Sequence, residues 1–163
     1  MAKTKKQTDI TKWIFLGIYL ILVGIYYFLT LRNSEDSTKD SSIIANILMW
    51  ILKVITLQKV EFNYEIIHHI TRKLVGHYGY NLILGLFGFL AIYNVKSIGN
   101  NALIINLLIG LFIAATSELL QFIPANRAPS YVDILINYMG EVTGILLVYV
   151  IVLYKSLKKT NQL

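Results

Sequence analysis

The sequence predicts an all-α membrane protein with four transmembrane helices in a bundle. Three observations predict it: 56% of the 163 residues are hydrophobic, only 15% are charged, and the mean hydropathy is +0.60. Soluble domains average about 45–50% apolar and about 25% charged residues, so this chain departs from both averages in the direction that a lipid bilayer requires. The composition excludes a disordered chain, a collagen-like chain and most soluble enzymes.

Four long apolar runs predict the membrane spans, at about residues 13–31, 74–95, 102–123 and 131–154. A hydrocarbon core about 30 Å thick needs about 20 helical residues, which the runs supply. The first run ends in aromatic residues without a small-residue cleavage pattern, so we interpret it as a retained helix rather than a signal peptide. We treat residues 1–163 as a single transmembrane domain, with a polar link at 96–101 and a loop with two prolines before the last span.

The predicted outer loop, residues 32–73, contains one ambiguous apolar segment. Residues 43–57 are interrupted by Asn46 and Lys53 and are too few for an ordinary span. We expect an extra short helix at 43–57 that is either interfacial or re-entrant.

Lysines at both ends of the chain predict its orientation. They flank the first and last spans: Lys3, Lys5, Lys6, Lys12, Lys155, Lys158 and Lys159. By the positive-inside rule both termini are cytoplasmic, which requires an even number of spans. The net charge of +6, from 15 Lys and Arg against 9 Asp and Glu, therefore reflects topology. We expect the lipid bilayer as a partner and no nucleic acid.

Seven polar groups fall at the outer ends of three spans and in the loop between two of them: Lys73, His77, Glu118, Gln121, Arg127, Asp133 and Asn137. Glu118 and Gln121 are three residues apart and Asp133 and Asn137 are four apart, so each pair lies on one helix face. An ionisable side chain costs roughly 2.5–3.5 kcal/mol at the centre of a span and usually faces a bundle interior or a wet cavity. These residues therefore predict one shared ligand-binding site in the outer leaflet.

A structural explanation stays open for each of these residues. Ser130 and Asp133 have the spacing of a capping box at the start of the last span. Arg127 can pair with lipid phosphate or with Glu118. The amides and the histidine can hold helices together through hydrogen bonds.

Motifs for other chemistries are absent from the sequence. The chain has no cysteine, which excludes disulfides, thiolate metal sites and a cysteine nucleophile. Glu65 and His69 have an i, i+4 spacing, but no HExxH pattern accompanies them and an amphipathic surface helix explains them. We expect no metal and no cofactor. Gly140 and Gly144 form a GxxxG step, which we interpret as a helix-packing site.

Two blocks of the sequence resemble the VanZ-like family of small polytopic membrane proteins, over about residues 72–150. The blocks are Lys73-x-x-x-His77-x-x-Tyr80 and Ser117-Glu118-x-x-Gln121 followed by Arg127, Asp133, Asn137, Gly140 and Gly144. Arg72 departs from the family, many members of which carry an acid at this position. The resemblance implies a multi-pass protein of the bacterial cytoplasmic membrane, some of whose relatives are associated with resistance to teicoplanin and related lipoglycopeptides.

Two functions from different classes fit these residues. The first is a non-enzymatic factor whose outer-leaflet site binds an anionic group, namely a lipid-linked cell-wall precursor, a phospholipid head group or a lipoglycopeptide. Lys73 and Arg127 suit its phosphate or carboxylate. The alternative is a membrane-embedded enzyme acting on the same head groups, with His77, Glu118, Asp133 and Arg127 as catalytic residues. The sequence favours the first function, because no nucleophile or nucleotide-binding motif accompanies the polar residues.

Overall fold

The structure, a computed structural model, describes residues 2–32, 34–93, 95, 101–124 and 127–160. The predicted link at 96–100, residues 125–126 of the proline-containing loop and the side chains of Lys3, Lys5, Lys6 and Lys159 lie outside this description. The helices are α1 (Ala2–Thr30), α2 (Ser34–Ile55), α3 (Tyr64–Thr71), the π-helix η1 (Arg72–Gly79), α4 (Tyr80–Tyr93), α5 (Ala102–Leu120) and α6 (Tyr131–Thr160).

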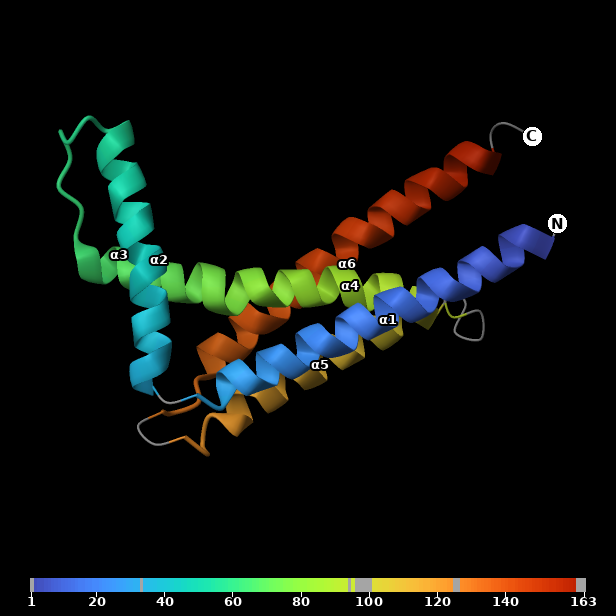
Figure 1. The fold of residues 1–163 in the computed structure, drawn as a ribbon, viewed down its shortest axis with the longest axis horizontal. Coiled ribbons are helices and arrows are strands. Elements are labelled where there is room, and N and C mark those ends of the chain that lie inside the picture. The colour runs from blue at the N-terminus through green and yellow to red at the C-terminus, as the bar shows by residue number, and fades with distance from the viewer. Residues whose placement is uncertain (1, 33, 94, 96–100, 125–126, 161–163) are drawn as a thin grey trace.

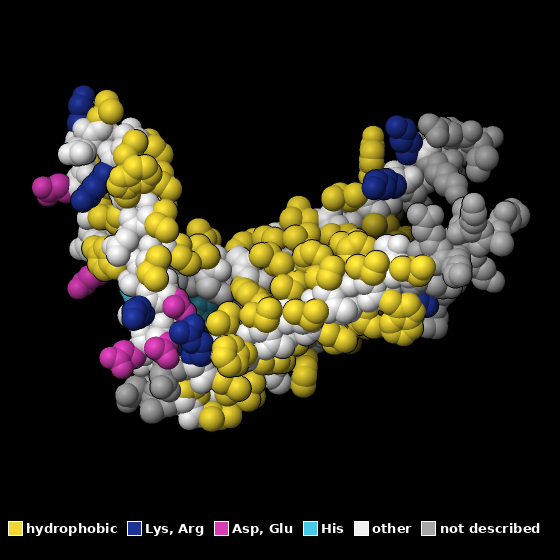
Figure 2. Space-filling model, viewed as in Figure 1, with side chains coloured by type: hydrophobic (Ala, Val, Ile, Leu, Met, Phe, Trp, Pro, Cys, Tyr) yellow, Lys and Arg dark blue, Asp and Glu magenta, His cyan; other side chains and the backbone are white. Residues whose placement is uncertain are grey.

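In the described part of the chain, four helices are long and apolar enough to cross a membrane. They are Ile10–Thr30, Tyr64–Tyr93, Ala102–Leu120 and Tyr131–Lys158, of which the second comprises α3, η1 and α4. Hydrophobic side chains cover the visible face of the bundle, and charged side chains gather near its two ends (Figure 2). The predicted all-α membrane fold with four spanning helices is confirmed.

The four long helices lie side by side, and α4 contacts α1, α5 and α6 (Figure 1). Both termini are at one end of the bundle, and α2 and α3 are at the other, which we call the loop end. The helices α4 and α6 run parallel, both starting at the loop end. Residues near the starts of both helices are therefore neighbours.

Glycines allow α4 and α6 to approach closely. A Cβ atom on Gly140 would overlap the backbone carbonyl of Tyr78, and one on Gly144 would overlap that of Leu82. The GxxxG step therefore lies at the contact between these parallel helices, where small residues let the two backbones meet.

The helix α2 is longer than the predicted segment at 43–57. It has 22 residues because the preceding polar stretch is helical too, with Glu35 and Asp36 in the first turn, where negative charge favours the helix dipole. It lies across the loop end rather than between the long helices (Figure 1). The next helix begins before the predicted span, at Tyr64, because the Asn63 side chain caps it by accepting hydrogen bonds from two backbone amides.

Candidate functional site

Polar side chains form a ladder between the parallel helices at the loop end. Lys73, His77 and Asn81 are successively four residues apart and face α6. Lys73 Nζ pairs with Asp133 Oδ1, and His77 Nδ1 lies 3.0 Å from Asn137 Oδ1. The Nδ2 atom of Asn81 donates to the same Asn137 oxygen at 3.1 Å. Residues that are 56 or 60 positions apart in sequence thus form direct pairs.

The first two residues of this ladder lie in the π-helical stretch η1. It contains Gly76 and Gly79, which are poor helix formers. Short π-helical stretches occur frequently at functional sites, because the wider turn changes the direction of side chains relative to a regular helix.

Glu118 joins the end of α5 to this ladder and is 1% exposed. Its Oε1 atom accepts hydrogen bonds from Gln121 Nε2 at 2.9 Å and from Asn137 Nδ2 at 3.2 Å. Its Oε2 atom accepts from the backbone N–H of Ser130 at 3.4 Å. One carboxylate therefore connects α5, the following loop and α6.

The predicted capping box is only half formed. The Oγ atom of Ser130 accepts from the backbone N–H of Asp133 at 3.4 Å, as an N-cap residue does. In a complete capping box the Asp133 carboxylate would accept a hydrogen bond from the backbone N–H of Ser130. Here Glu118 accepts that bond instead, because the carboxylate of Asp133 is paired with Lys73. Helix capping therefore does not account for the Asp133 side chain.

The imidazole of His77 lies between two carboxylates. Its Nδ1 atom is 3.6 Å from Glu118 Oε1, and its Nε2 atom is 3.8 Å from Asp133 Oδ2. One potential ligand atom from each of the three residues lies within 4.8 Å of the others, and all three residues are buried. The structure thus brings together six of the predicted site residues, which with Asn81 and Ser117 form what we call the polar cluster: Lys73, His77, Asn81, Ser117, Glu118, Gln121, Asp133 and Asn137.

Hydrogen bonds determine which nitrogen of His77 carries the proton. The amide nitrogen of Asn137 faces a carboxylate oxygen of Glu118, so the carbonyl oxygen of Asn137 faces His77. A carbonyl oxygen only accepts, and therefore Nδ1 donates. In the neutral ring the lone pair is then on Nε2, which has no hydrogen-bond partner among the described residues.

The seventh predicted site residue, Arg127, holds the end of α1. Its Nη1 atom donates to the backbone carbonyls of Thr30 and Arg32 at 3.0 and 3.1 Å, which satisfies acceptors left over at a helix end. It forms no ion pair with Glu118 within the described residues. Burial lowers the pKa of the Arg127 guanidinium and the nearby Arg72 acts in the same direction, but an arginine remains charged at neutral pH.

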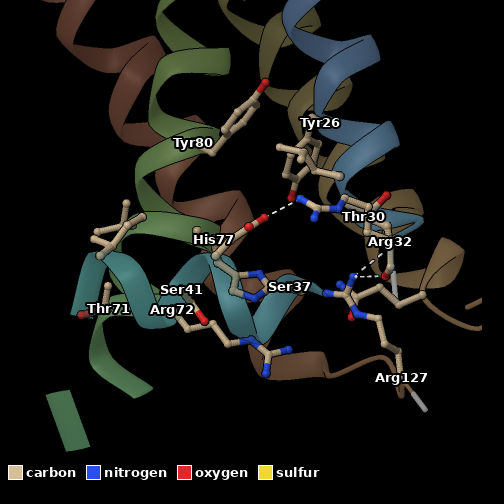
Figure 3. A pocket seen from close by; sticks show the side chains of 16 residues that line it. Tyr26, Thr30, Arg32, Ser37, Ser41, Thr71, Arg72, His77, Tyr80 and Arg127 are labelled. Atoms are coloured by element: carbon tan, nitrogen blue, oxygen red, sulfur yellow. Dashed lines mark hydrogen bonds and ion pairs between the residues drawn. The ribbon is translucent and has the colours of Figure 1, made fainter. Parts of the chain in front are cut away.

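A cavity of about 280 Å³ adjoins the polar cluster at the loop end (Figure 3). Residues from α1, α2, η1 and α4 line it, together with Gln121 and Arg127. It collects the guanidinium groups of Arg32, Arg72 and Arg127 against the single carboxylate of Asp40. The cavity is therefore suited to an anion.

The three cations of the cavity differ in their protein partners. Arg32 pairs with Asp40, whereas the guanidinium group of Arg72 has no hydrogen-bond or ion-pair partner among the described residues. The Nε atom of Arg127 is buried and has no partner there either. Two of the three guanidinium groups thus keep unused donors.

Several residues of this region were missed from sequence. Tyr26 on α1 accepts from Asn81 Nδ2 at 2.9 Å and donates to Ser117 Oγ at 3.2 Å. Asn81 follows His77 by four residues, and this helical spacing is the signal that could have revealed it. By contrast, no local pattern indicates that Arg32 and Arg72 line one cavity.

The residues Glu65 and His69, weighed from sequence as a metal pair, are exposed on α3 outside the polar cluster. Their neighbour His68 lies 2.8 Å from Ser41 Oγ and stacks on Tyr64. Rather than forming a separate surface helix, α3 packs against α2 and continues directly into η1 and α4.

Comparison with known proteins gives one family. No curated protein and no solved structure matches the chain. The family model described as VanZ/LLP1 matches residues 15–153, from within the first long helix to within the last. The resemblance noted in the sequence is confirmed, and it extends beyond 72–150 to include most of α1. Since the match covers most of its length, the chain belongs to the VanZ/LLP1 family.

Proposed function

We propose that the protein binds the anionic head group of an amphiphile in the cavity at the loop end. One observation carries this proposal: Arg72 and Arg127 present donors without protein partners to a cavity that holds three cations and one anion. The Nε atom of Arg127 is buried, and a buried donor without a partner costs about 1–3 kcal/mol. An anionic oxygen would satisfy these donors through charge-assisted hydrogen bonds, which are stronger than neutral ones.

The apolar part of the lining supports a lipid-linked ligand. Leu29, Ile44 and Val75 line the cavity beside the arginines. A volume of about 280 Å³ is near the lower limit of about 300–1,000 Å³ for small-molecule sites, so it suits a head group rather than a whole lipid. The acyl chains would then lie along the apolar outer surface of the bundle.

The orientation in the membrane is part of the proposal. The lysines near both termini favour a cytoplasmic location for that end of the bundle. The loop end, with the cavity, then faces the outer side of the bacterial cytoplasmic membrane. In this orientation α2 lies in the interfacial plane, which its crosswise position and its mixed polar and apolar composition support.

Three kinds of ligand share the required chemistry: a lipid-linked cell-wall precursor, a phospholipid, and a lipoglycopeptide of the teicoplanin type. The link to teicoplanin comes from the family resemblance. In a susceptible bacterial host we expect the wild-type chain to raise the teicoplanin concentration that stops growth, and Arg127→Ala or Glu118→Gln to remove this protection. Immunoblots of the membrane fraction would establish equal protein levels, and full protection by both variants at equal levels would contradict the resistance role.

Native mass spectrometry of the purified protein tests the binding proposal. The probes are phosphatidylglycerol and phosphatidylcholine with identical acyl chains, which differ in net charge. We expect phosphatidylglycerol to bind more tightly and Arg72→Gln to weaken it about tenfold, since a hydrogen bond to a charged group contributes about 1.5–3 kcal/mol. The matched control is Lys53→Gln, which removes the same charge from an exposed position on α2. Equal binding of both lipids by wild type and Arg72→Gln would refute the proposal.

A second function, hydrolysis of the bound head group, is favoured by one observation. His77 lines the cavity, and its Nε2 atom has no hydrogen-bond partner among the described residues, as a general base requires. Incubation of the purified protein with radiolabelled membrane lipids, followed by chromatography, would detect turnover. Turnover that disappears in His77→Gln would establish an enzyme, and unchanged lipids would exclude hydrolysis of the lipids tested.

A further inference from the structure

We propose that His77, Glu118 and Asp133 bind a divalent transition-metal ion such as Zn²⁺ beside the cavity. One donor atom from each residue lies within 4.8 Å of the other two, and all three residues are buried. The sequence led us to expect no metal, because it contains no cysteine and no HExxH motif. In the structure the three residues belong to η1, α5 and α6. Only the packing of these helices brings them together.

The donor set and the distances fit a zinc ion. Imidazole nitrogen and carboxylate oxygen bind zinc at about 2.0–2.2 Å, which places neighbouring donors of a tetrahedral site about 3.4 Å apart. His77 Nε2 and Asp133 Oδ2 are 3.8 Å apart, so that pair needs little movement. The donor atoms of the three residues lie within 4.8 Å of one another, but Glu118 Oε1 is 3.6 Å from the other ring nitrogen, Nδ1, so the Glu118 side chain must move to reach an ion on Nε2.

The surroundings of His77 are those of a metal ligand. A histidine that binds a metal usually donates its other ring N–H to an oxygen, which fixes the tautomer and the ring direction. Here Nδ1 donates to Asn137 Oδ1 at 3.0 Å, and the lone pair on Nε2 is directed toward Asp133. His77 is only 8% exposed, and its Nε2 atom has no hydrogen-bond partner among the described residues. A metal ion would supply that partner.

The two carboxylates are also held in place by other groups. Glu118 accepts hydrogen bonds from Gln121 and Asn137, and Asp133 uses Oδ1 for Lys73, which leaves Oδ2 on the side of the imidazole. Such bonds to the ligands orient them before the metal arrives.

The charge of the polar cluster favours a cation. It contains the carboxylates of Glu118 and Asp133 but only one ammonium group, that of Lys73. Arg127 is engaged with backbone carbonyls. An unpaired buried charge is strongly unfavourable, so the second carboxylate must either take up a proton or gain a positive partner. A divalent ion bound by both carboxylates and the neutral imidazole provides it.

Three protein ligands leave a fourth position on a tetrahedral zinc ion. Since His77 lines the cavity, this position lies near the site proposed for the anionic head group. A role for the metal in holding a phosphate oxygen rests on the proposed function, whereas metal binding itself does not.

Zinc titration without added lipid tests the metal site. The full-length protein, purified in detergent with an affinity tag that contains no histidine, is treated with EDTA, freed of it, and titrated with ZnCl₂ against a fluorescent zinc indicator. We expect one ion per chain, and about tenfold or greater weakening in Glu118→Gln, Asp133→Asn and His77→Ala. The matched controls Glu65→Gln and His69→Ala change the same residue types on the exposed face of α3 and should bind like wild type.

A variant expected to bind zinc more tightly shows that the weaker binding of the ligand variants is not caused by misfolding. Lys73→Met removes the competing cation from Asp133, so it should bind Zn²⁺ more tightly than wild type, and Zn²⁺ should raise its melting temperature more. The proposal is overturned if wild type retains no zinc, or if the three ligand variants bind zinc like the controls. If zinc binds but phosphatidylglycerol shows no preference, the head-group proposal fails and the metal site stands. If phosphatidylglycerol is preferred but zinc does not bind, the metal site is refuted and the head-group proposal stands.

Discussion

The Nδ1 atom of His77 lies 3.0 Å from the side-chain oxygen of Asn137, and this contact orients the whole polar cluster. The amide of Asn137 also donates to Glu118 at 3.2 Å and accepts from Asn81 at 3.1 Å. One fully buried side chain thus connects groups from η1, α4 and α5. Its position on α6 determines which nitrogen of the imidazole is left to face Asp133.

Asn137→Leu should destabilise the protein more than any other single amide replacement in the bundle. It removes one hydrogen bond each from Glu118 and Asn81, which keep others, and leaves Nδ1 of His77 without a hydrogen-bond partner among the described residues. A buried polar group without a partner costs about 1–3 kcal/mol. The measurement is the free energy of unfolding in detergent micelles. Asn106→Leu is the control, because the buried side chain of Asn106 donates, among the described residues, only to the carbonyl of Ala102 in its own helix. Equal losses in both variants would contradict the central role of Asn137.

The sequence contains enough information to place much of this cluster. Helical spacing puts Lys73 with His77 and Asp133 with Asn137, and the alternation of spans brings both pairs to one end of the bundle. The direct pairing of 73 with 133 and of 77 with 137 depends in addition on the parallel register of α4 and α6, which glycine contacts set.

The cavity could not be predicted, for a physical reason. Arg32 follows α1 and Arg72 begins η1, and they face one space only because α2 lies across the loop end. The direction of α2 depends on tertiary contacts with α3 and not on local periodicity. The same applies to Asp133, whose spacing from Ser130 fits a capping box but whose carboxylate pairs with Lys73 from another helix.

Gly144→Ala and Gly24→Ala should have effects of opposite sign. A Cβ atom on Gly144 would overlap the carbonyl of Leu82, so the parallel helices must separate, which overpacking data put at about 1–3 kcal/mol. A Cβ atom on Gly24 meets nothing within 4 Å, and alanine in a helix interior is favoured over glycine by about 0.5–1 kcal/mol. Thermal unfolding in detergent measures both changes. A harmless Gly144→Ala would contradict the close contact of α4 and α6.

Glu141→Met should stabilise the protein. Glu141 is 2% exposed, lies against Gly110, and has one carboxyl oxygen without a partner among the described residues. Methionine has a similar shape and needs no hydrogen bond, so it removes a cost of about 1–3 kcal/mol. An increase in melting temperature without a change in phosphatidylglycerol binding is the expected result. A loss of lipid binding would instead show that Glu141 contributes to the site.

Fluorescence quenching should establish whether α2 lies in the membrane interface. The chain has two tryptophans, Trp13 and Trp50, so Trp13→Phe leaves Trp50 on α2 as the sole tryptophan, whose emission is then followed. The side chain of Trp50 is 67% exposed, and α2 lies across the loop end of the bundle. An interfacial amphipathic helix buries its apolar face only about 5–10 Å into the bilayer. We therefore expect stronger quenching by lipids brominated near the head group than by lipids brominated near the chain ends. The reverse order would show a re-entrant segment, and α2 could then not cover a head-group cavity at the membrane surface.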